Sequence, residues 1–290
     1  MKNIEIIGKI FGLSLGLTYL LFFQGNELYE WICFISILIL VGIPHGAIDH
    51  LLLSPEINKE KLFKFIVKYL AIIVVYLAVW MIFPKWALFA FILMSAYHFG
   101  QSHFIKFRIK KFERLTYLSL GLFFLSTILW GDFEYTTSIL SNIIEVSFLE
   151  NYGFLFILLT FSFSTILILI NLQKEAFGLL LESMCLGILL YYLPLLLGFI
   201  IYFGFWHSLP SMKEEFEALE NYLKVDKLKG FIKKLLPFTL ISLTGISVIL
   251  IIFSKMMNPD QLTLLFFVLV SLISAPHIWY MNMFLDTRKG

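Results

Sequence analysis

The sequence is poor in charged residues. Only 14% of its 290 residues are Asp, Glu, Lys or Arg, whereas about 25% are charged in an average soluble domain. The net charge of +2 excludes the strongly basic surface that nucleic-acid binding requires. Because 60% of the residues are hydrophobic and only helices or closed barrels satisfy their backbone in lipid, we expect an all-α bundle that spans a membrane several times.

Cysteine is also scarce. Cys33 and Cys185 are the two cysteines, and both stand in apolar runs without the spacing of a metal site. This excludes a disulfide framework and indicates that both residues serve in packing. Apart from Asp49, no Asp or Glu cluster accompanies the histidines of the chain. A site for magnesium or calcium, which prefer oxygen ligands, is therefore disfavoured.

Long apolar runs are abundant. A membrane-spanning helix needs about 20 apolar residues, and roughly ten stretches qualify, with eight or nine as the alternative count. Pro194 is the point at which two of the ten would merge into one kinked helix. The predicted spans are 4–23, 31–53, 62–83, 86–106, 114–131, 152–171, 177–193, 195–209, 231–254 and 261–284.

Basic residues alternate between the connecting loops. The loops at 54–64, 107–113 and 211–234 are rich in Lys and Arg, whereas the loops between them are mainly acidic. Positively charged loops face the cytoplasm, so this alternation predicts that both termini are cytoplasmic. We expect a single integral membrane domain over residues 1–290, with an amphipathic cytoplasmic segment at about 211–229.

All the histidines lie in apolar stretches. An ionisable residue inside the membrane is energetically unfavourable and marks a functional site, and neutral imidazole is the commonest protein ligand of transition metals. The predicted topology puts every histidine in the cytoplasmic half, on four helices that run in the same direction. An all-nitrogen site of this kind fits iron, copper or zinc. The six histidines are His45, His50, His98, His103, His207 and His277.

In two segments of the chain, the spacing between the histidines places them on different faces of a helix. His45 and His50 are five residues apart, as are His98 and His103, which places each pair about 140° apart on a regular helix. One member of each pair is then a ligand and the other is not, unless the helix is distorted. Distortion is expected at Pro44, which removes a backbone donor.

Asp49 stands four residues after His45 and would share its helix face. Its carboxylate would then accept the second ring N–H of a ligating histidine and fix the tautomer of that histidine. The alternative is an ion pair between Asp49 and a protonated His50.

The segments GIPHGAIDH, YHFGQSHF, FWHSLPSM and APHIWYMNM, in this order, resemble the Brp/Blh family of membrane β-carotene 15,15'-dioxygenases, over about residues 31–285. The resemblance implies a polytopic cell-membrane enzyme that uses Fe(2+) and O₂ to split the central double bond of β-carotene into two retinal. β-Carotene or a related carotenoid would be the substrate, and a rhodopsin is a candidate acceptor of the product.

The resemblance also implies the ligand set. The family's metal-binding histidines correspond to His45, His98 and His207, and the late PH motif corresponds to His277. Some members carry a further histidine where this chain has Ser211. The fourth ligand is then His277, or else His50 or His103, the last of which aligns with Asp in some members. Asp49 would support a ligand, with Gln101 as a polar neighbour.

Two other functions remain open from the sequence. A di-metal membrane desaturase or hydroxylase acting on a lipid would use all six histidines. A metal or proton transporter would need acidic residues along a pathway through both membrane halves, and the outer half of this chain has almost none.

Overall fold

The computed structural model describes residues 3–52, 54–223 and 226–289, and this part of the chain is helical without a strand. Eight of its helical segments are long and apolar enough to cross a membrane. The prediction of a polytopic helical bundle is confirmed, and the number of candidate spans lies at the low end of the alternative count of eight or nine. These segments are Ile4–Phe23, Glu27–Leu52, Lys59–Ile82, Glu113–Gly131, Ser147–Asn171, Leu195–Tyr222, Lys227–Phe253 and Pro259–Thr287.

The difference from ten spans concerns two predicted segments. The segment 86–106 becomes helix α5 (Pro84–Ser102), which has polar residues at both ends and is not among the eight. The segment 177–193 becomes α9 (Ala176–Tyr191), which at 1.5 Å per residue is about 24 Å long and shorter than a hydrocarbon core of about 30 Å. The expected division at Pro194 is present, because α9 ends at Tyr191 and α10 begins at Leu195.

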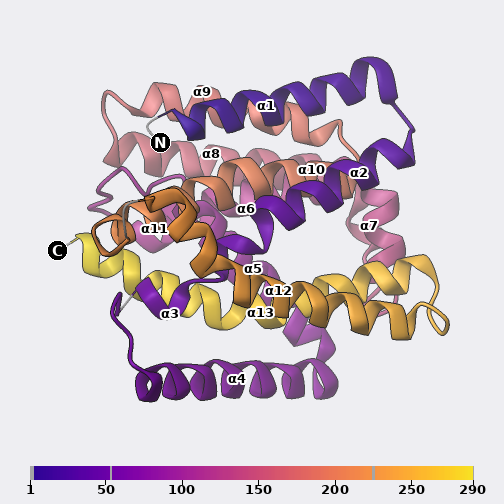
Figure 1. Cartoon of the computed structure of the whole chain (residues 1–290). Coiled ribbons are helices and arrows are strands. Elements are labelled where there is room, and N and C mark those ends of the chain that lie inside the picture. The colour runs from indigo at the N-terminus through magenta and orange to yellow at the C-terminus, as the bar shows by residue number, and fades with distance from the viewer. Residues whose placement is uncertain (1–2, 53, 224–225, 290) are drawn as a thin grey trace. The chain divides into compact units, whose positions relative to one another are not determined.

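The chain forms two compact units. Unit 1 comprises residues 1–38 and 92–210, and unit 2 comprises residues 39–91 and 211–290. Within unit 1, α6 packs along α8 and α9, and α10 packs against α1 and α2 (Figure 1). Besides most of α5, its elements are α1 (Ile4–Thr18), η1 (Tyr19–Phe23), α2 (Glu27–Ile37), α6 (Glu113–Gly131), α7 (Phe133–Leu140), η4 (Ser147–Tyr152), α8 (Gly153–Asn171), α9, α10 (Leu195–Tyr202) and η5 (Phe203–Ser208).

Unit 2 is built on two long helices that lie side by side, α12 and α13 (Figure 1). Helix α4 packs on α13, where Trp80 Nε1 donates to Ser271 Oγ at 3.0 Å and Tyr69 Oη donates to the Ile273 carbonyl at 3.1 Å. Pro276 interrupts the hydrogen-bond ladder inside α13. The elements are η2 (Leu38–Gly42), η3 (Pro44–Gly46), α3 (Asp49–Leu52), α4 (Lys59–Ile82), α11 (Leu209–Leu219), η6 (Glu220–Tyr222), α12 (Lys227–Phe253) and α13 (Pro259–Lys289).

The second predicted span is not a continuous α-helix. It passes from α2 into the π-helix η2, then into the single 3₁₀ turn η3 that begins at Pro44, and resumes as the short helix α3. Pro44 has no N–H group to continue the ladder, so the distortion expected there is confirmed. His45 is the middle residue of this 3₁₀ turn.

The segment predicted as an amphipathic cytoplasmic helix, 211–229, is divided among α11, η6 and the start of α12. Phe216 and Leu219 of this segment are buried, as the amphipathic pattern requires. Residues 224 and 225 of the prediction lie outside the described part of the chain. The cytoplasmic position of this segment and of both termini, and the single domain over 1–290, stay predictions.

In unit 1, α5 and α6 touch through their backbones. A Cβ on Gly121 would lie 1.7 Å from the carbonyl oxygen of Ala96, and a Cβ on Gly100 would lie 1.8 Å from that of Tyr117. No rotamer change can relieve an overlap with backbone, so both positions require glycine. This close approach fixes the part of α5 that carries His98.

Replacing Gly121 by Ala is therefore expected to destabilise the protein by about 1–3 kcal/mol, the usual effect of overpacking. Thermal unfolding in detergent measures the effect. Gly178→Ala is the matched control in the same unit, because no atom lies within 4 Å of its added Cβ and alanine is favoured over glycine in a helix by about 0.5–1 kcal/mol. Equal melting temperatures for the two variants would contradict the α5–α6 packing.

Candidate functional site

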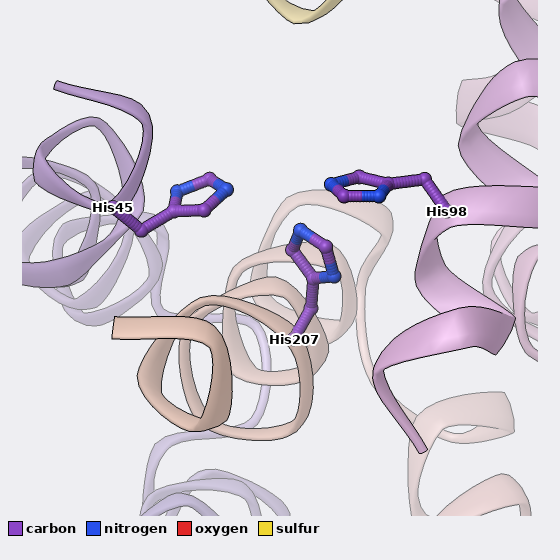
Figure 2. A group of neighbouring side chains, drawn as sticks. All are labelled: His45, His98 and His207. Carbon is purple, nitrogen blue, oxygen red and sulfur yellow. The ribbon is translucent and has the colours of Figure 1, made fainter. Parts of the chain in front are cut away.

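Unit 1 brings together two of the predicted ligands. His98 lies on α5 and His207 on the π-helix η5, and their ring centroids are 4.5 Å apart at an interplanar angle of 73°. Both side chains are buried, with exposed fractions of 4% and 1%. Figure 2 shows these two rings turned toward each other from different helices. The pair is a preformed set of nitrogen donors within one unit.

The π-helix that carries His207 is held by its neighbours. Trp206 Nε1 donates to Glu182 Oε1 at 2.7 Å, and the same oxygen accepts from Lys9 Nζ at 2.7 Å. The wide turns of π-helices recur at functional sites because they redirect side chains. Here the contact of Trp206 anchors one side of η5 while the adjacent His207 projects toward α5. Its Nδ1 lies 2.7 Å from the hydroxyl oxygen of Ser102.

Unit 2 brings together the other two predicted ligands. The rings of His45 on η3 and His277 on α13 make an edge-to-face contact, with centroids 4.7 Å apart and an interplanar angle of 85°. Both are buried, with exposed fractions of 6% and 3%. Gly46 permits this approach, because a Cβ there would lie 3.2 Å from Nδ1 of His277.

The ring proton of His45 is directed by the broken helix. His45 Nδ1 donates to the carbonyl oxygen of Gly42, the last residue of η2. A carbonyl only accepts hydrogen bonds, so the proton of this imidazole is on Nδ1 and the lone pair is on Nε2. Gly42 stands three residues before His45, on the other side of the helix break at Pro44.

Asp49 contacts a histidine of another helix, His277 of α13, and not His45. Its Oδ1 accepts from His277 Nδ1 at 2.8 Å, and Tyr69 Oη lies 3.4 Å from its Oδ2. The i, i+4 relation to His45 assumed a regular helix, and the helix is interrupted between these two residues. The carboxylate fixes the lone pair of His277 on Nε2 in the manner of a carboxylate–histidine–metal triad.

His50 and His103 lie among aromatic rings. His50 packs on Phe238 and Phe65 in unit 2, with centroids 4.8 and 5.9 Å away. His103 stacks on Phe124 in unit 1 at 4.9 Å, and its Nε2 lies 3.1 Å from Tyr202 Oη. The diverging directions that five-residue spacing implies are thus present in both motifs.

Gln101 is buried on α5, three residues after His98, with 2% of its surface exposed. Ser211, which holds the place of a histidine found in some members of the family that the chain resembles, is also 2% exposed.

Sequence reasoning missed two buried polar residues. Ser102 contacts His207, although nothing distinguishes its hydroxyl from those of other helical serines. Glu215 of α11 is 0% exposed, and neither of its carboxyl oxygens has a hydrogen-bond partner within the described residues. The signal for Glu215 was its position beside Phe216 and four residues before Leu219, on the apolar side of the segment.

A double-mutant cycle tests the Asp49–His277 contact. We expect the substitutions Asp49→Ala and His277→Ala to be coupled by about 0.5–3 kcal/mol in the free energy of unfolding, because each removes the partner of the other. The control cycle pairs Asp49→Ala with His50→Ala and should show coupling near zero. Stronger coupling of Asp49 to His50 would support the ion pair considered from the sequence and contradict the contact.

Comparison with known proteins agrees with the sequence resemblance. The family described as beta-carotene 15,15'-dioxygenase matches residues 36–285. A relative named beta-carotene 15,15'-dioxygenase, from Uncultured marine bacterium 66A03, is 29% identical over 85 residues. That alignment covers 28% of this chain and 30% of the relative, so the chain matches less than a third of the relative's length. No solved structure matches the chain. Because the family match includes all six histidines and spans most of the sequence, the chain belongs to the beta-carotene 15,15'-dioxygenase family.

Proposed function

We propose that this protein is a β-carotene 15,15'-dioxygenase that uses one Fe(2+) ion, held by His45, His98, His207 and His277. The observation that carries the proposal is the presence of a buried, closely spaced imidazole pair in each unit, His98 with His207 and His45 with His277. Family membership supports the reaction. Both pairs belong to motifs that resemble the ligand motifs of that family.

The donor set fits such an ion. His45, His98 and His207 are buried, and each offers one ring nitrogen as a metal ligand. The Nδ1 atoms of His45 and His277 donate to oxygen acceptors, which leaves the lone pair of each ring on Nε2. Neutral imidazoles oriented in this way are the ligands that iron, copper and zinc take in proteins. Iron is the metal we propose, because the reaction incorporates O₂.

When bound, iron supplies the redox chemistry that activates O₂. The protein keeps water away from the site. Phe99 and Phe203 pack on His207, with ring centroids 4.7 and 5.5 Å from its ring. Aromatic surfaces of this kind suit a polyene substrate, for which the membrane is the natural reservoir. Cleavage of one carbon–carbon double bond, with one oxygen atom added to each carbon, gives two molecules of retinal.

His277 is the fourth ligand in this proposal. Ser211 stands where some members of the family have a histidine, and a hydroxyl is a poor replacement for imidazole at an all-nitrogen site. His277 is already in ring contact with His45 and is oriented by Asp49. Asp49 therefore acts on the metal through His277, and Gln101 remains a polar neighbour of His98.

A di-metal lipid desaturase or hydroxylase is the principal alternative. It would need His50 and His103 as ligands of a second ion. The packing of these two rings on phenylalanine side chains favours one ion per chain over two. A rhodopsin as acceptor of the product, and the plasma membrane as the location, stay proposals that rest on the family resemblance.

Alanine at His98 or His45 should abolish both bound iron and retinal formation, since each removes one nitrogen donor from a pair. Iron per chain is measured on purified protein by elemental analysis, and retinal is measured in a bacterial host that accumulates β-carotene.

His50→Ala is the matched control, because it removes a histidine of the same motif that packs on aromatic rings. It should retain about one iron per chain and most of the activity. Two irons in the parent protein, with one lost in His50→Ala, would instead establish the di-metal alternative. Full iron content and activity in His98→Ala would refute the proposed site.

A further inference from the structure

Ser102 of unit 1 lies between the backbone of α5 and the imidazole of His207. It is the last residue of α5, four residues after His98, and 7% of its surface is exposed. Its hydroxyl oxygen lies 2.8 Å from the carbonyl oxygen of Phe99, 3.3 Å from that of His98 and 2.7 Å from Nδ1 of His207. One small side chain thus contacts the backbone of the helix that bears His98 and the imidazole of His207.

The number of protons determines the direction of each bond. A serine hydroxyl has one proton to donate, and backbone carbonyls only accept. In the structure the Ser102 hydroxyl donates to the two carbonyls of α5, with the shorter bond to Phe99. The contact with His207 is then possible in one sense, in which Nδ1–H of the imidazole donates to a lone pair of the Ser102 oxygen. It follows that the lone pair of the His207 ring is on Nε2.

We infer that Ser102 is a positioning residue for His207, which accepts the Nδ1 proton of that imidazole and so presents Nε2 to the metal ion. The inference rests on the proposed function only in taking His207 as a metal ligand. The same bond fixes the ring of His207 relative to the turn of α5 that bears His98. Ser102 therefore determines the tautomer of His207 and also holds its ring at a fixed distance from His98.

Two other serines of unit 1 show that the bond to the helix backbone does not require a histidine. Ser126 Oγ donates to the Phe123 carbonyl at 3.0 Å, and Ser119 Oγ donates to the Thr116 carbonyl at 3.1 Å. Both are buried on α6. They share the helix context and the back-bond of Ser102, and among the described residues their hydroxyls bond only to their own helix. They therefore separate the effect of burying a serine from the effect of supporting an imidazole.

The experiment compares Ser102→Ala with Ser126→Ala in the full chain. Binding of Fe(2+) or Co(2+) is measured by competition with a chelator. Loss of an oxygen that orients a ligating histidine typically weakens metal binding about 10–100-fold. We expect a weakening of this size for Ser102→Ala and unchanged affinity for Ser126→Ala. Ser102→Thr keeps the hydroxyl and should restore affinity, because threonine can make the same back-bond in a helix.

A second measurement needs no metal, and its decisive comparison needs only the parent protein. Long-range ¹H–¹⁵N correlation spectra of ¹⁵N-histidine-labelled, metal-free protein distinguish the two neutral tautomers of His207. The expected state is Nδ1–H in the parent protein, with this preference lost in Ser102→Ala. An Nε2–H tautomer for His207 in the parent protein would overturn the inference, even if Ser102→Ala could not be purified.

The outcomes also separate this inference from the proposed function. If His207→Ala leaves metal affinity unchanged, the proposed ligand set is wrong. If His207→Ala abolishes binding while Ser102→Ala and Ser126→Ala both bind as tightly as the parent, the ligand set stands and Ser102 is a packing residue.

Discussion

An imidazole buried among apolar helices has one ring proton, and that proton needs an oxygen acceptor. Leaving a buried donor unsatisfied costs about 1–3 kcal/mol, so the acceptor decides which nitrogen keeps its lone pair. The chain provides acceptors of three kinds: the backbone carbonyl of Gly42 for His45, the carboxylate of Asp49 for His277 and the hydroxyl of Ser102 for His207. In each case Nδ1 contacts the acceptor, which leaves Nε2 as the nitrogen that would bind the proposed metal ion.

Three of the four histidines of the proposed site stand at helix irregularities. His45 follows a π-helix and stands in a 3₁₀ turn, His207 stands in a π-helix and His277 directly follows Pro276. Only α5, which carries His98, is a regular helix, and the close backbone contacts of Gly100 and Gly121 hold it against α6. Three of the proposed ligands are therefore carried by irregular segments, and the fourth, His98, is carried by a regular helix.

The sequence predicted correctly those features that depend on residues close to one another along the chain. The proline in PHGA predicted the break at His45, and five-residue spacing predicted that His50 and His103 would point away from their partners. It did not predict side-chain contacts between residues that are far apart in the sequence. Asp49 was assigned by helical spacing to a neighbour four residues away, whereas its partner is 228 positions along the chain. Ser102 could not be singled out, because a helical serine gives no sign in the sequence of what it faces. Glu215 is one of several charged residues in the amphipathic segment, and only the fold shows that it is buried.

The three acceptors differ in how far they can change over evolution or in the laboratory. A backbone carbonyl is present whatever side chain its residue carries. Substitution at Gly42 therefore leaves the hydrogen-bond acceptor of His45 in place. The hydroxyl and the carboxylate are side chains, and a single codon change can make the acceptor stronger, weaker or neutral. If these histidines bind the proposed metal ion, electron donation from His207 and His277 can be changed by substituting the acceptor, whereas that from His45 cannot. Variation in redox potential among enzymes with this arrangement should accordingly be concentrated at the positions of Ser102 and Asp49.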